Sequence, residues 1–93
     1  MQTLNSANYG ATLAEAAEHL RNLEPFHTGT LSGLVEPLDG MQFYVVRSYG
    51  TPIAMTLMNS GALDPEPEVF PSAYTHSATT SKHANLVKRA WGL

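Results

Sequence analysis

Apolar residues recur at helical spacing close to the start of the chain. Five of them follow the 3, 4, 7 spacing of an amphipathic helix between residues 13 and 23, and charged residues fall between them. Thr12 followed by Glu15 is typical of a capping box at the helix start. Pro25 is expected to end the helix, because the residue before a proline avoids the helical conformation. The apolar positions are Leu13, Ala16, Ala17, Leu20 and Leu23.

The middle of the chain has the pattern of a β-hairpin. Two apolar-rich runs between residues 42 and 58 are joined at residues 48–52, and the turn signal Asp39-Gly40 precedes them. Side chains alternate along the first run, yet both of its faces are largely apolar, which is typical of a central strand. Residues 30–35 are expected to form a weak strand or a loop.

The last third of the chain is expected to contain a loop, a short strand and a helix. Residues 59–71 hold three of the six prolines and three of the eight acidic residues, so we expect an exposed Pro-rich loop. Residues 72–77 are expected to add a short strand. A helix should follow from the hydroxyl-rich residues 79–81 to about Trp91, with Gly92 ending it.

Together these patterns predict an α+β fold in a single domain that spans residues 1–93. We expect a small antiparallel sheet of three to four strands, centred on the 42–58 hairpin, with an N-terminal and a C-terminal helix packed on one face. The first hairpin strand is apolar on both faces, whereas the two helices can cover only one. We therefore expect the second face to be an interface, either in a homodimer or with a host protein.

Composition narrows the class of protein. The chain is 43% hydrophobic and 14% charged, as expected of a folded domain. It has no cysteine, which excludes disulfides and thiolate metal sites, and its formal net charge of -3 gives no general attraction to nucleic acid. The N-terminal residues lack the pattern of a signal peptide, and no apolar run is long enough to span a membrane. We expect a cytoplasmic protein with no membrane contact.

Four short motifs, spread from residue 20 to residue 83, carry a family resemblance. They are LRNLEPF at 20–26, GTLSG at 29–33, YVVRSYGTPIA at 44–54 and SATTSKH at 77–83. In their order they resemble a family of small uncharacterised proteins of actinobacteriophages and their actinobacterial hosts. The resemblance implies a phage or actinobacterial origin and a compact α+β unit, and brings no established activity. The chain departs from the family pattern at His76, where Tyr is usual, and at Ala84, where Gln is usual.

Hydroxyl groups and a cation gather at the expected start of the last helix. Beside the free amides of a helix N-terminus, such groups form a candidate anion or partner site. The alternative is that Thr79 or Thr80 only caps the helix. A site is expected where residues 48–52 meet this helix start. The candidate residues are Ser48, Tyr49, Thr79, Thr80, Ser81, Lys82 and His83.

The sequence carries no strong catalytic or metal signature. The four histidines are not spaced as zinc ligands, so we expect no metal and no cofactor. Catalysis by Ser48 or Ser81 would need His83 as its base. An acid, Asp39 or Glu36, would then have to orient that base. The residues around Ser48 lack the glycine pattern of a nucleophile elbow, and we expect no catalytic residue.

The expected last helix also carries a candidate basic surface, formed by Lys88, Arg89 and Trp91 with Lys82 nearby. An aromatic ring beside cations can contact nucleic acid. Trp91 shares a helix face with Leu86, which favours a core or partner contact instead.

The function that these observations predict is that of a phage-encoded, non-catalytic interaction protein that binds a host or phage protein in the host bacterial cytoplasm. The alternative is a nucleic-acid-binding accessory protein that uses the basic surface. A third hypothesis is a small hydrolase or transferase that uses Ser81 and His83, and it requires an open pocket at the start of the last helix.

Overall fold

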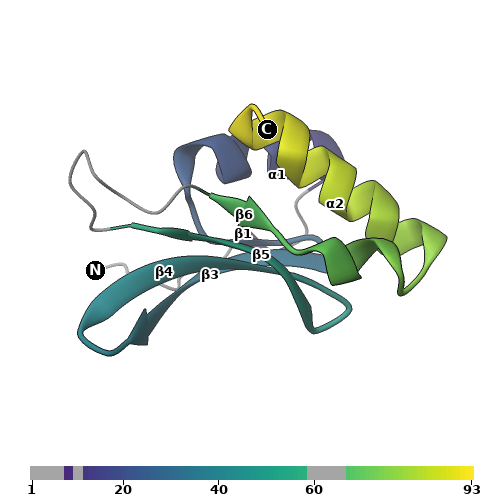
Figure 1. Ribbon diagram of the computed structural model, residues 1–93. Coiled ribbons are helices and arrows are strands. Elements are labelled where there is room, and N and C mark those ends of the chain that lie inside the picture. Colours follow the sequence, from purple (N-terminus) through teal and green to yellow (C-terminus); the bar gives the residue numbers. More distant parts are fainter. Residues whose placement is uncertain (1–7, 10–11, 59–66) are drawn as a thin grey trace.

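Two helices pack on one face of a single sheet in the computed structural model, which describes residues 8–9, 12–58 and 67–93 (Figure 1). The strands are β1 Asn8–Tyr9, β2 Phe26–His27, β3 Leu31–Leu38, β4 Met41–Ser48, β5 Thr51–Leu57 and β6 Glu68–Val69; the helices are α1 Leu13–Asn22, the 3-10 helix η1 Pro71–Tyr74 and α2 Ala78–Trp91. The strands lie side by side in chain order. β2 to β6 are antiparallel, and β1 joins the β2 edge in parallel.

The predicted α+β class is confirmed, but three to four strands are too few, since β2 to β6 form five antiparallel strands. β2 and β6 have two residues each, which is too short for an alternating pattern to be recognised. β6 lies within residues 59–71, where we expected only an exposed loop; residues 59–66 of that loop lie outside the described residues. The strand expected at residues 72–77 is wrong, because the proline at the start of η1 favours a helical turn there.

Helix α1 begins as its sequence predicts. The Thr12 hydroxyl accepts the Glu15 N–H at 3.2 Å, and the Glu15 carboxylate accepts the Thr12 N–H at 2.9 Å, which completes the capping box. At the other end Leu23 adopts the left-handed conformation, with φ 54°, and turns the chain toward the sheet. Tyr44 of β4 then holds this turn, because its hydroxyl donates to the Glu24 carbonyl at 2.7 Å.

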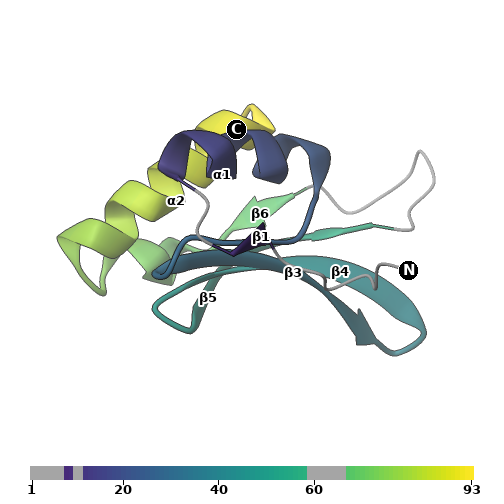
Figure 2. The ribbon, with the colours of Figure 1, turned by 180° about the vertical axis from the view of Figure 1, so that it is seen from behind.

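The alternation of side chains divides the sheet into a covered face and an open face. Buried Tyr44 and Val46 of β4 lie opposite Val35 and Gly33 of β3, under the helices. Within the described residues no helix lies on the opposite face (Figure 2). A bulge between β4 and β5 places Ile53 on the covered face beside Ala54, whereas strict alternation from Met55 and Leu57 would place it on the open face.

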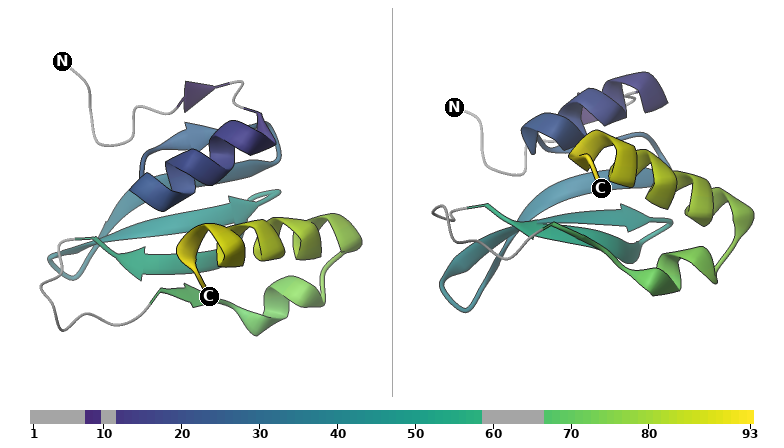
Figure 3. Two further views of the ribbon diagram at one scale, coloured as in Figure 1. Left: turned by 90° about the horizontal axis from the view of Figure 1, so that it is seen from above. Right: turned by 45° about the horizontal axis from the view of Figure 1, so that its top comes forward.

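The two helices run side by side and in the same direction over the sheet (Figure 3). Buried Ala16 and Leu20 of α1 and Ala84 and Val87 of α2 belong to the core between the helices and the covered face. The C-terminal ends of both helices therefore lie on the same side of the molecule.

Candidate functional site

The corner between β4 and β5 meets the start of α2, as the sequence predicts. Ser48 is the last residue of β4, and alternation points its side chain to the covered face. Its hydroxyl oxygen lies 2.7 Å from Nδ1 of His83 and 3.2 Å from the hydroxyl oxygen of Thr80. Together with Ser77, these three residues form a hydroxyl–histidine cluster.

Ser77, and neither Thr79 nor Thr80, is the N-cap of α2. Its backbone is extended, and its hydroxyl accepts the Thr80 N–H at 3.0 Å. The same hydroxyl donates to the Thr80 hydroxyl at 3.1 Å. Three hydroxyl residues within four positions all suit the chemistry of an N-cap, so the sequence alone does not distinguish them. The helix begins at Ala78, slightly earlier than predicted.

In the hydroxyl–histidine cluster Ser48, Thr80 and His83 are buried and Ser77 is exposed, and the hydrogen bonds can all run in one direction. In that arrangement Ser77 donates to Thr80, Thr80 donates to Ser48, and Ser48 donates to Nδ1 of His83. His83 then carries its proton on Nε2. Only 5% of His83 is exposed, and burial lowers the pKa of its imidazole, which favours this neutral form near neutral pH.

The lowered pKa of His83 predicts a pH-dependent stability. The unfolded chain binds a proton at the ordinary pKa of about 6.5, whereas the folded chain does so only at lower pH. The stabilisation that neutral His83 contributes should therefore be complete above about pH 6.5. Below that pH the free energy of unfolding should fall by at most about 1.4 kcal/mol per pH unit. Urea denaturation at about pH 7.5 and about pH 5.5 measures this fall.

His83→Gln is the matched variant for this measurement, because glutamine can accept the Ser48 hydrogen bond and does not titrate. The other histidines remain in both proteins, so the difference in slope isolates His83. Equal slopes for the wild-type protein and His83→Gln would contradict the prediction.

The other predicted site residues lie around this cluster. Tyr49 is 61% exposed, and its ring centroid lies 6.1 Å from that of His83. Thr79 and Lys82 are exposed, and Ser81 is half-buried. Among the contacts of the described residues it is Ser48, rather than Ser81, that is hydrogen-bonded to His83. Both serines are candidate partners of His83 in the sequence, and the residues around them do not distinguish the two.

The geometry of the cluster is that of a buried structural network. Ser48 is only 1% exposed, whereas a nucleophile must be reached by its substrate. Neither acid considered from the sequence orients His83: Glu36 is bound to Arg47, and Asp39 lies in the turn at the opposite end of β4. The hydrogen bonds of the cluster join the β4–β5 corner to the first turns of α2.

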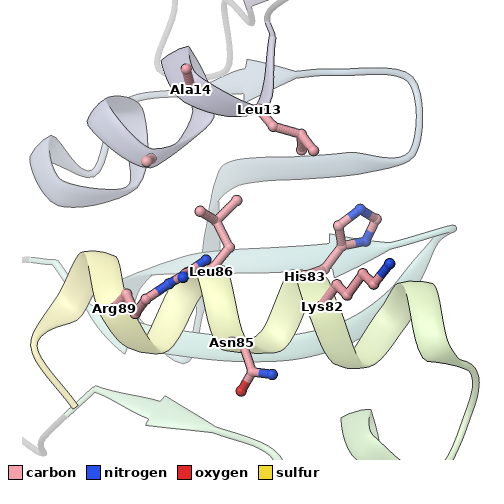
Figure 4. A pocket seen from close by; sticks show the side chains of 8 residues that line it. Leu13, Ala14, Lys82, His83, Asn85, Leu86 and Arg89 are labelled. Carbon is pink, nitrogen blue, oxygen red and sulfur yellow. The ribbon is translucent and has the colours of Figure 1, made fainter.

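A cleft of about 530 Å³ opens between α1 and α2, beside His83 (Figure 4). Lys82 and Arg89 of α2 both line it, so the structure brings together one residue from each of the two sites that were separate candidates in the sequence. The α1 side of the cleft is made of Leu13, Ala14 and Ala17, of which the sequence placed only Leu13 and Ala17 on the apolar helix face. The cleft needs two helices to form, so neither helix alone predicts it.

The remaining residues of the basic surface do not form one patch. Trp91 is half-buried, packs edge-on against Tyr44, and donates its indole N–H to the Leu20 carbonyl at 2.9 Å. Its ring is therefore a contact between the helices and the core. Lys88 is exposed, and its amine lies 5.9 Å from the centre of the Tyr74 ring.

The open face of the sheet is the other candidate surface. Leu34, Val45 and Met55 stand in register across β3, β4 and β5, and Phe43 and Leu57 form the next row. All five are half-buried. Glu36 stands in the row of Phe43, and Arg47 stands one row beyond Val45, so their two-bonded ion pair spans the row of Leu34 and Val45. Arg47 holds the pKa of Glu36 below its usual range. At the hairpin end, Leu38 and Met41 are exposed.

In the described part of the chain, no group of three or more His, Asp or Glu side chains is placed to hold a metal ion. No helix there has the length and apolar character needed to cross a membrane. No protein-family model, curated protein or solved structure matches this chain.

Proposed function

We propose that this chain is a small non-catalytic interaction protein that binds another protein through the open face of its sheet. The observation that carries the proposal is the apolar surface of Leu34, Phe43, Val45, Met55 and Leu57, which no described helix covers. An apolar surface that includes a few polar groups has the composition of a protein interface. The Glu36–Arg47 ion pair, which spans the row of Leu34 and Val45, supplies these polar groups.

The partner we propose is a host or phage protein in a bacterial cytoplasm, as the resemblance to small actinobacteriophage proteins implies. The burial of Ser48 and His83 supports a non-catalytic role. The position of Trp91 favours a protein partner over nucleic acid, because an indole that packs on Tyr44 and Leu20 is not available for stacking on a base.

Val45→Glu tests this proposal, because it places a charge at the centre of the open face. Capture from bacterial lysate with the wild-type protein should recover a partner that Val45→Glu no longer recovers. The purified pair should then bind in calorimetry, with a loss of at least about tenfold in affinity for the variant. Thr79→Glu is the matched control, since it adds the same charge at an exposed site on α2 and should keep the partner.

Three outcomes decide the test. A partner lost with Val45→Glu and kept with Thr79→Glu supports the proposal. Light scattering that shows a dimer disrupted by Val45→Glu would identify the partner as a second copy of this chain. A partner that binds both variants equally, or a monomeric wild-type protein with no specific partner, would overturn binding through the open face.

A further inference from the structure

We propose that the α1–α2 cleft binds a small organic acid with an apolar body, such as a medium-chain carboxylate. This site is separate from the open face, which lies on the other side of the sheet. The proposal rests on three properties of the cleft, which are its volume, its charge and its apolar floor.

The volume exists because α1 presents small side chains to α2. Ala14 and Ala17 are one turn apart on the same helix face, and both line the cleft. Larger residues at these positions would fill the space between the helices. The resulting volume of about 530 Å³ is within the range of about 300–1,000 Å³ that is usual for small-molecule sites.

The charge of the cleft favours an anion. Lys82 and Arg89 line it, and neither forms an ion pair with an acid among the residues that the structure describes. The protein as a whole has a net charge of -3, so two cations at one cleft differ in sign from the chain as a whole. In Figure 4 the Arg89 side chain extends toward Leu86 along the cleft, whereas Lys82 lies near its other end.

The apolar floor decides between a carboxylate with an apolar body and a bare phosphate. A phosphate site gathers several donors around one point. Here the two cations are seven residues apart on α2, or roughly 10 Å along the helix axis, and Leu86 lies between them. Leu13, which is 52% exposed, faces this stretch from α1. A carboxylate can pair with Arg89 while its apolar part covers these two leucines.

Octanoate is the probe for this site. A titration followed by amide chemical shifts should saturate, with the largest changes in residues 13–17 and 82–89. Arg89→Gln should weaken binding about tenfold, as expected for loss of a charge-assisted hydrogen bond. Ala17→Leu should weaken it by filling the cleft. Lys88→Gln removes the same charge from α2 outside the cleft, and should change the affinity by less than about twofold.

The outcomes that would overturn the proposal are equally specific. Absence of saturation at millimolar octanoate would show that the cleft is not such a site. Equal binding of octanol would show that the two cations do not contribute to binding. Equal weakening by Lys88→Gln and Arg89→Gln would show that only the net charge of α2 contributes. Shifts confined to the open face would place the ligand elsewhere. Arg89 is exposed, so Arg89→Gln is expected to fold even if Ala17→Leu does not.

Discussion

Replacing Gly33 with alanine is expected to destabilise the fold by about 3 kcal/mol, the upper end of the usual cost of overpacking a core. A Cβ atom at this position would lie 2.2 Å from the Tyr44 hydroxyl oxygen and 2.7 Å from Cε1 of Phe26. Both side chains are completely buried, and the Tyr44 hydroxyl is held by the Glu24 carbonyl, so neither ring has room to move. Urea denaturation followed by circular dichroism measures the change in the free energy of unfolding.

A double-mutant cycle identifies the cause of this loss. Tyr44→Phe alone should cost about 1 kcal/mol, because the Glu24 carbonyl loses its donor. In the double variant Gly33→Ala/Tyr44→Phe the closest clash, which is with the Tyr44 hydroxyl oxygen, is absent. Its loss of stability should therefore be smaller than the sum of the losses in the two single variants. Ser32→Ala, on the other face of the same strand, should change stability by less than about 0.5 kcal/mol. A Gly33→Ala protein as stable as the wild type would contradict the close packing described above.

Trp91→Ala is expected to cost about 3 kcal/mol, and Trp91→Phe about 1 kcal/mol. The alanine variant loses the packing on Tyr44 and the hydrogen bond to the Leu20 carbonyl, whereas phenylalanine keeps most of the packing. The Leu20 carbonyl lies in the last turn of α1 and also accepts the Leu23 N–H at 3.3 Å, so the indole N–H is its second donor. Trp91 at the end of α2 thus adds a hydrogen bond to the end of α1.

Trp91 is the only tryptophan of the chain, so its variants must be followed by far-ultraviolet circular dichroism rather than by fluorescence. Leu93→Ala is the control, because Leu93 is 51% exposed and should contribute less than about 0.5 kcal/mol. A loss below about 1 kcal/mol for Trp91→Ala would mean that this residue does not hold the two helices together.

The sequence predicts those parts of the fold that local chemistry determines. The capping box of Thr12 and Glu15, the end of α2 at Gly92 and the alternation along β4 each depend on residues close together in the chain. The strands that were missed are short, and the bulge at Ile53 interrupts the alternation of side chains along β5. These features depend on pairing with neighbours, which leaves no periodic signal in the strand itself.

The candidate site was likewise predicted only in part. A site was expected where the 48–52 corner meets the start of α2, and the structure places Ser48 in contact with Thr80 and His83. The specific pair of Ser48 and His83 is 35 residues apart in the sequence and depends on where α2 crosses the sheet. The α1 wall of the cleft was not predicted, because it depends on two alanines of α1 facing two cations of α2.

The two-residue turns β3–β4 and β4–β5 have the same backbone geometry and different residues. In each turn both central residues have positive φ, as in a type I′ turn. Asp39 tolerates this conformation, whereas for most side chains, Tyr49 included, it costs roughly 1–2 kcal/mol. Tyr49 is mostly exposed and recovers little of that cost by burial. Asn, Asp or Gly at this position would avoid that cost, so the β4–β5 turn holds an unfavourable backbone conformation that places the Tyr49 ring beside His83.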